Sequence, residues 1–523
     1  MKKAIYVILT LLLILINSAT AMVVQKRRAN EPTRLTEAHA ALTTGDLVKA
    51  EAALEEMIKA QPNAAEAYNL LGIVRDQQNR TNEAEELFLR ALKLKPTLLN
   101  ARNNLGNNYL KQGRAQEALQ QFKLVLRSDR NHIEANYNLA LIYLEKGPYK
   151  NALTHLTRVY RRLGPQPTVL FALLEANLKV KKTATAEKIL QRIFTLKDED
   201  GRVHFTAGLM LASNGNYERA AEAFQYTAER QPSAFEAHYN LGLALYNLDR
   251  YEAAEKALAT AADLRPDEPE VHYRLGLVFS ARGDVKGAIE EFKHTIERNP
   301  KHAEAYFMMG EEYYKRDAVT AAVTAYEKAV ELASDKPLYH VKLGNACFKL
   351  FKYARAEQAY RQVLAISDPK ELEIHYLIGY ALRSQGKLTD AIPFFEKELT
   401  LHPNNAESFA NLGYLYLELG DFVESEKYLR ATLDKQPNHS EARYNLGRLL
   451  VRQKRYQEGE QELLQAIKLK PDYTQAHYQL FLAYTRTGQP DKAEKELEIF
   501  KRLEEEDKRE RDERERRQRE ALQ

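Results

Sequence analysis

The feature that most constrains this chain is a period of 34 residues. Tripeptides that end in a small residue recur at this spacing or its double, with one step of 35 residues between Gly344 and Gly379. Their last residues are Gly72, Gly106, Ala140, Gly208, Gly242, Gly276, Gly310, Gly344, Gly379, Gly413 and Gly447. A fixed period of this length is typical of solenoids, whose units are too thin to bury an apolar side alone and therefore stack.

Two further markers follow the same frame. A second small residue stands twelve positions after the first, and in many copies a proline follows twelve positions later. The second small residues are Ala84, Ala118, Ala152, Ala220, Ala254, Ala288, Ala322, Ala356 and Ala391. In the copy that begins at Phe235, Gly242 and Ala254 fall where two antiparallel helices would cross closely, and Pro266 has no N–H to continue the second helix. Each copy is therefore predicted to be a helix, a turn, a second helix and a stop.

This pattern resembles the tetratricopeptide repeat (TPR), and the resemblance covers nearly the whole chain. The copy from Phe235 to Glu268 carries the family's frame most fully, at His238, Leu241, Gly242, Tyr246, Ala254, Leu258, Ala261 and Pro266. The resemblance implies an all-α fold, a right-handed α-solenoid (superhelix) of antiparallel helix pairs. Counting outward from this copy predicts about fourteen repeats over residues 31–507 and no separate catalytic domain.

Some segments depart from the pattern. Leu174 stands where glycine is expected, between Gly164-Pro165-Gln166-Pro167 and Asp198-Glu199-Asp200-Gly201, so a weak seam is predicted near residues 164–200. A normally stacked, divergent copy is the alternative. Pro393 is expected to bend or shorten the second helix of its copy. Residues 491–523 interleave acids and bases and predict a charged capping helix, or alternatively a docking helix for a partner.

The amino-terminal segment has the order of a secretory signal peptide. Two lysines precede an apolar run, and small residues follow as far as Ala21, which predicts a signal peptide of residues 1–21 and a linker of residues 22–30. The alternative is an uncleaved anchor over residues 4–24, close to the length that crosses a bilayer. The expected location is therefore exported, periplasmic or secreted, or else anchored in the inner membrane.

Composition and motifs argue against an enzyme. The sequence contains no motif for a nucleophilic serine, a phosphate-binding loop, a zinc-binding helix or a paired-cysteine redox site. With 77 Lys and Arg against 73 Asp and Glu, the net charge of +4 gives no strong attraction to nucleic acid. Histidines that share one repeat position would lie about 8–10 Å apart or more, too far for one zinc. We therefore expect no catalytic residue, no metal and no cofactor.

Two adjacent positions of the repeat carry the candidate binding residues. The first is aromatic in many copies, and the second is often asparagine. The residues singled out are Tyr137, Tyr239, Tyr273, Tyr444, Asn104, Asn138, Asn240, Asn411 and Asn445. By resemblance to the family, both positions line a concave groove, where rings would accept apolar segments and amides would hydrogen-bond a main chain. The asparagines resemble the repeat region of O-linked N-acetylglucosamine transferases, but packing is a competing role for both positions.

Together these features predict a non-catalytic protein–protein interaction scaffold of the bacterial cell envelope. It would bind a partner protein or extended peptide in the groove, and would contact a membrane only through an uncleaved amino-terminal segment. Two alternatives stand beside it. One is a substrate-recruiting subunit for a separately encoded enzyme such as a glycosyltransferase, and the other is a structural protein that assembles with copies of itself into a homo-oligomer.

Overall fold

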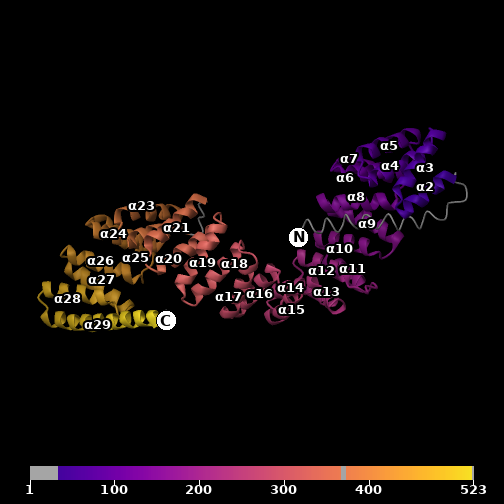
Figure 1. The fold of residues 1–523 in the computed structure, drawn as a ribbon. Coiled ribbons are helices and arrows are strands. Elements are labelled where there is room, and N and C mark those ends of the chain that lie inside the picture. Colours follow the sequence, from indigo (N-terminus) through magenta and orange to yellow (C-terminus); the bar gives the residue numbers. More distant parts are fainter. Residues whose placement is uncertain (1–32, 367–372, 521–523) are drawn as a thin grey trace. The chain divides into compact units, whose positions relative to one another are not determined.

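The computed structural model describes residues 33–366 and 373–520, and it is 81% helical. Over those residues the chain forms 28 helices and no strand. The helices divide between two compact units, one ending at Pro266 and one beginning at Asp267, and each is described by itself. Within each unit, consecutive helices pack side by side along the chain (Figure 1).

The first unit contains the helices α2 to α15. They are α2 (Thr33–Thr44), α3 (Leu47–Ala60), α4 (Ala65–Gln77), α5 (Thr81–Leu94), α6 (Leu99–Lys111), α7 (Ala115–Ser128), α8 (Ile133–Lys146), α9 (Tyr149–Leu163), α10 (Pro167–Lys179), α11 (Thr183–Phe194), α12 (Arg202–Ser213), α13 (Tyr217–Arg230), α14 (Phe235–Tyr246) and α15 (Tyr251–Leu264).

The second unit contains the helices α16 to α29. They are α16 (Pro269–Arg282), α17 (Val285–Arg298), α18 (Ala303–Lys315), α19 (Val319–Leu332), α20 (Pro337–Lys349), α21 (Tyr353–Ile366), α22 (Ile374–Ser384), α23 (Leu388–Leu401), α24 (Ala406–Leu419), α25 (Phe422–Lys435), α26 (Ser440–Arg452), α27 (Tyr456–Leu469), α28 (Thr474–Arg486) and α29 (Pro490–Glu520). Even-numbered labels mark the first helix of each pair and odd-numbered labels the second. The predicted all-α class and the stacked helix pairs are confirmed.

The two helices of a pair differ in how much of their surface is buried. The first helix α8 buries most of its side chains, whereas the second helix α9 buries only Ala152, Leu156 and Val159. Those three residues lie on one face of α9, since they are spaced by four and three positions. The first helices therefore lie inside the stack, and the second helices cover it with one apolar face.

Each glycine of a first helix makes room for a large side chain of the second helix, sixteen residues later. The pairs are Gly72–Phe88, Gly106–Phe122, Gly208–Phe224, Gly242–Leu258, Gly276–Phe292, Gly310–Tyr326, Gly344–Tyr360, Gly379–Phe395, Gly413–Leu429 and Gly447–Leu463. A Cβ atom on Gly276 would lie 2.5 Å from Cε1 of Phe292, which is far inside van der Waals contact. The small residue of the second helix contributes its backbone instead, because a Cβ on Gly242 would lie 3.3 Å from the carbonyl oxygen of Ala254.

The predicted seam contains a buried polar cluster. Asp198 is only 6% exposed, and one of its carboxylate oxygens lies 2.6 Å from Nδ1 of His204. The same carboxylate accepts the backbone N–H groups of His204 and Val203. The His204 ring stacks between Phe194 and Tyr226 at centroid distances of 4.9 and 3.5 Å. These contacts join the end of α11 to the start of α12, so the short link between them is held by specific bonds.

Pro393 was expected to bend or shorten its helix, but the helix is not shortened. It lies inside α23, which has 14 residues, as many as the second helix α25. Proline removes the hydrogen bond to the carbonyl group four residues earlier, at Thr389. Both residues are exposed, so water can satisfy that carbonyl group and the helix continues.

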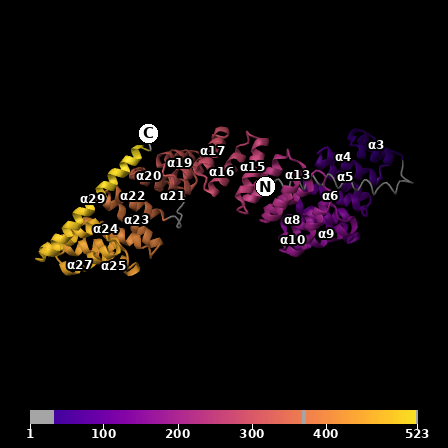
Figure 2. The ribbon, with the colours of Figure 1, turned by 90° about the horizontal axis from the view of Figure 1, so that it is seen from below.

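The carboxyl-terminal helix α29 packs on α28 and then extends further (Figure 2). Along the packed part, Glu496 lies 2.6 Å from the ring of His477, and Asp507 accepts a hydrogen bond from Thr474 at 2.9 Å. Leu503 is buried there, at 8% exposure. The part of α29 before Lys508 therefore covers α28, the first helix of the last pair.

The amino-terminal predictions are outside the described residues. They concern the signal peptide of residues 1–21, the anchor of residues 4–24 and the linker of residues 22–30. No helix in the described part of the chain has the length and apolar character needed to cross a bilayer.

The glycine pairs predict whether a substitution at the glycine stabilises or destabilises the protein. Gly276→Ala should destabilise the second unit by about 1–3 kcal/mol, because the clash with Phe292 outweighs the gain of about 1 kcal/mol in helix propensity. In a Phe292→Ala background the clash is gone, so the same substitution should stabilise the unit. Denaturant unfolding followed by circular dichroism measures both effects. Destabilisation of equal size in the two backgrounds would contradict the assignment.

The cluster at Asp198 yields a pH prediction. Burial raises the pKa of Asp198, but hydrogen bonds from the side chain of His204 and from two backbone N–H groups outweigh it, so the pKa lies below its usual value. The stabilisation is therefore complete above the unfolded pKa, about 3.9, and is lost as the pH falls through the folded value. Asp198→Asn should cost roughly 1–3 kcal/mol at neutral pH and should reduce the loss of stability in acid.

Hydrogen exchange of α11 and α12 measures this effect locally. The matched control is Asp200→Asn, because Asp200 lies nearby but its side chain is 46% exposed. An equal change in exchange for both variants would count against the role of the buried cluster.

Candidate peptide-binding surface

The first helices of neighbouring pairs contact each other directly. Examples are α4 with α6, α6 with α8, α22 with α24 and α24 with α26. We call the surface that the first helices of each unit form together the first-helix face. Both sets of sequence-predicted binding residues lie on first helices, because they occupy adjacent positions two and three residues before the glycine.

Two of the predicted asparagines bond to other asparagines across the first-helix face. Nδ2 of Asn104 donates to Oδ1 of Asn69 at 2.9 Å, and Nδ2 of Asn138 donates to Oδ1 of Asn107 at 2.7 Å. These bonds join α6 to α4 and α8 to α6. The amide groups therefore link neighbouring repeats, and Asn138 is buried at 4% exposure.

The other three predicted asparagines do not form an open row. Asn240 and Asn411 donate to backbone carbonyl groups of their own helices, at 2.7 and 2.8 Å. Asn411 and Asn445 are buried, at 3% and 1% exposure. Oδ1 of Asn445 has no hydrogen-bond partner among the described residues. Of the five, only Asn104 and Asn240 are partly exposed, so a continuous ladder of available amides is not present.

The predicted aromatic stripe is also mostly covered. Tyr137 is buried at 4% exposure, and burial raises its pKa to about 12. Tyr273 packs against His302 with ring centroids 4.6 Å apart, and Tyr444 packs against Tyr473 at 4.7 Å. Tyr239 is partly exposed and stacks on Phe235 of the same helix, at 5.6 Å. The rings therefore serve packing first, and their exposure differs from one repeat to the next.

An arginine that the sequence did not single out connects three repeats of the second unit. Arg383 of α22 donates to Oδ1 of Asn411 in α24 and pairs with Glu441 of α26 at 3.2 Å. Its guanidinium group lies 4.0 Å from the ring centroid of Tyr414. Arg383 was missed because its partners are 28 and 58 residues away in the sequence, and only stacking brings them together.

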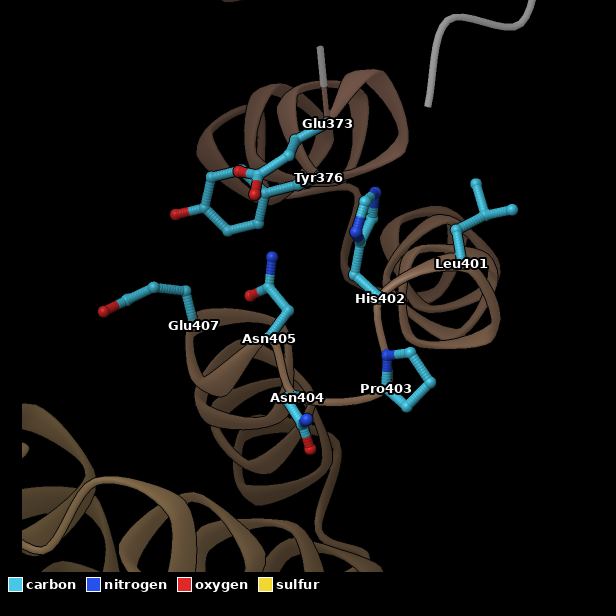
Figure 3. A pocket seen from close by; sticks show the side chains of 8 residues that line it. All are labelled: Glu373, Tyr376, Leu401, His402, Pro403, Asn404, Asn405 and Glu407. Atoms are coloured by element: carbon cyan, nitrogen blue, oxygen red, sulfur yellow. The ribbon is translucent and has the colours of Figure 1, made fainter. Parts of the chain in front are cut away.

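A pocket of about 590 Å³ opens beside Tyr376, which belongs to α22, the helix that carries Arg383 (Figure 3). Its lining residues are Glu373, Tyr376, Leu401, His402, Pro403, Asn404, Asn405 and Glu407. The side chains of Tyr376, His402 and Asn405 converge on it from α22, from the link after α23 and from the start of α24 (Figure 3). Burial and the nearby carboxylates raise the pKa of Tyr376 to about 12. The pocket therefore combines a protonated phenol with acidic side chains.

The described residues contain no group of three His, Cys, Asp or Glu side chains suited to a metal ion. Cys347, the single cysteine of the chain, is buried in the core of the second unit. Burial raises the pKa of its thiol, which keeps it protonated and unreactive at neutral pH.

Comparison with protein-family models identifies the repeats. One tetratricopeptide repeat model matches residues 35–98, 103–167, 205–269, 341–406 and 411–474. A TPR repeat model matches residues 310–350, and a further tetratricopeptide repeat model matches residues 394–427. The first model alone covers more than half of the chain, so the chain belongs to the tetratricopeptide repeat family. The resemblance of its asparagines to those of O-linked N-acetylglucosamine transferases is not confirmed.

Solved structures with similar chains include two that are described as TPR proteins. The C-terminal part of a TPR repeat-containing protein from Cytophaga hutchinsonii is 20% identical, with 46% of this chain and 99% of that chain covered and a TM-score of 0.42. YrrB, described as a TPR protein with an unusual peptide-binding site, is 23% identical, with 36% and 98% covered and a TM-score of 0.32. MamA from Desulfovibrio magneticus RS-1 is 23% identical, with 33% and 97% covered and a TM-score of 0.31. A search of the curated proteins finds no match.

The Arg383 cluster yields a stability prediction. Arg383→Met keeps most of the side-chain volume but removes the guanidinium group, leaving Oδ1 of Asn411 without its donor. The second unit should lose roughly 1–3 kcal/mol, measured by denaturant unfolding. Arg430→Met is the matched control, because Arg430 forms its ion pair within its own helix, with Glu426 four residues earlier. Similar losses for both variants would show that the contacts between repeats add nothing.

Proposed function

We propose that this chain is a protein-interaction scaffold of the bacterial cell envelope that holds an extended segment of a partner protein along its first-helix face. Membership of the tetratricopeptide repeat family makes the chain a protein-interaction scaffold. The envelope location and the bound segment are the proposed parts. The proposal of an exported chain rests on the leader-like order of residues 1–21, with an inner-membrane anchor over residues 4–24 as the other form.

The observation that carries the binding proposal is the uneven exposure of the first-helix face. Most of its polar and aromatic groups are used in contacts between repeats, whereas a few stay accessible. Tyr239, Asn240 and the rim of the pocket at Tyr376 are partly or fully exposed. Such accessible groups, on a face that packing has already made rigid, allow an extended segment to bind at little cost in ordering the protein.

Export is tested on the natural protein from cells. Amino-terminal sequencing should find a mature chain that begins at Met22, recovered from a periplasmic or secreted fraction. A chain that retains Met1 and fractionates with the inner membrane would indicate the anchored form. A chain that retains Met1 in the cytoplasm would overturn the envelope location.

Binding is tested by photo-crosslinking in cells. A photoreactive amino acid at Tyr239 should give one defined protein adduct, whereas the same group at Leu89 should give none. Leu89 is the control because it is 46% exposed on the second helix α5, away from the first-helix face. Adducts of the same pattern from both positions would contradict a specific binding face.

A further inference from the structure

The pocket at Tyr376 is open because no aromatic side chain from the start of the next first helix covers the ring of Tyr376. In two other copies, the residue that caps the next first helix packs on the equivalent tyrosine: His302 on Tyr273, and Tyr473 on Tyr444. The residue in that place next to Tyr376 is asparagine, Asn405. Its side chain is too short to cover a phenol ring, so the space stays open to solvent (Figure 3).

The copy that contains Tyr273 shows which group fits such a space. The imidazole of His302 packs on that ring, with Nε2 3.6 Å from a carboxylate oxygen of Glu270 and Nδ1 3.6 Å from one of Glu304. Because Nδ1 accepts the N–H of Ala305 at 3.1 Å, the neutral ring carries its proton on Nε2, toward Glu270. The hydrogen bond from His302 lowers the pKa of Glu270. In this copy, a flat N–H donor, the imidazole of His302, therefore lies against the tyrosine ring and between two carboxylates.

The pocket presents the same partners without the occupant. Glu373, Tyr376 and Glu407 stand at the positions of the frame that Glu270, Tyr273 and Glu304 hold in the other copy. Both carboxylates at the pocket are exposed, and both line it. Among its eight described lining residues there is no lysine or arginine to neutralise them.

Three basic residues of the described part of the chain that lie nearby already have partners. Arg383 takes part in the ion pair with α26 described above. Lys435 donates to Oδ1 of Asn404 at 3.0 Å, on the rim of the pocket. Nε2 of His439 lies 3.3 Å from one oxygen of Glu407, whose side chain nevertheless stays 55% exposed. The carboxylates of Glu373 and Glu407 are therefore not fully neutralised by these three residues.

We propose that this pocket binds a basic side chain, arginine above all, from the extended segment of the partner protein. The inference rests on the proposed function and names the chemistry of one contact within it. A guanidinium group is flat, donates N–H bonds in its plane and stacks on an aromatic face, so it meets two carboxylates and a tyrosine ring together. Lysine would pair with the carboxylates but would cover the ring less well.

The test uses the full chain and two small probes, N-acetyl-arginine amide and N-acetyl-citrulline amide. Citrulline has nearly the same shape but no charge. Calorimetry and saturation-transfer NMR should show about tenfold tighter binding of the arginine probe, the factor expected for one charge-assisted contact. Equal affinity of the two probes would overturn the proposal, as would a lack of binding by both.

The decisive variant is Asn405→His, which supplies the cover that His302 provides elsewhere. Folding should be preserved, because histidine caps first helices in this chain at His302 and His439 through Nδ1. Binding of the arginine probe should fall by about tenfold or more, and Glu373→Gln should weaken it by several-fold. Asn131→His, the same substitution at an exposed residue before α8 and outside the pocket lining, is the matched control and should bind as the unchanged chain does. Unchanged binding by Asn405→His would place the probe outside the pocket and refute the assignment.

The probe experiment separates this inference from the proposed function. If no arginine probe binds in the pocket while a partner crosslinks at Tyr239, the pocket assignment fails and the scaffold stands. If the probe binds and Asn405→His blocks it, the pocket is established even where no partner crosslinks at Tyr239, and only the proposed function fails.

Discussion

The contact between a glycine of the first helix and a large side chain of the second is the interaction on which the fold depends. At Gly276 and Phe292 the ring takes the space that any Cβ would need. The two helices can therefore approach closely, and a bulky residue lies at the centre of each pair. Phe292 is completely buried, and its equivalents Phe88, Phe224 and Phe395 are exposed by at most 1%. Repeated in ten of the described helix pairs, this fit sets the distance within those pairs and produces apolar faces on which the next pair stacks.

Polar contacts then determine how neighbouring pairs meet. On the first-helix face, amide pairs such as Asn104 with Asn69 join successive first helices. Between second helices, arginines reach back to the previous copy, as Arg114 does to Glu85 at 2.6 Å and Arg455 to Glu426 at 2.7 Å. Each ion pair is partly exposed, so each contributes little by itself. Their regular recurrence nevertheless favours one alignment between repeats, which apolar packing alone specifies less strictly.

This use of polar groups explains where a partner can bind. A side chain that already bonds to a neighbouring repeat, such as Asn138, offers little to a ligand. The groups left over occur where a repeat deviates from its neighbours, and Asn405 beside Tyr376 is such a place. Under this proposal, binding capacity follows from a difference between two copies. The carboxylates and the ring of the Tyr273 copy recur at Tyr376, but the side chain that covers Tyr273 has no counterpart there.

The sequence by itself determined the repeat, the all-α class and the order of the helices, because these depend on spacing along the chain and on residue size. It identified the right helices for the candidate site, yet it overestimated how many of the predicted asparagines and tyrosines are available. Exposure depends on which side chain of the next repeat lies over each residue, as His302 lies over Tyr273 and Arg383 reaches Asn411. Those neighbours are tens of residues apart in sequence, so only the tertiary structure decided which rings are covered and where a pocket remains.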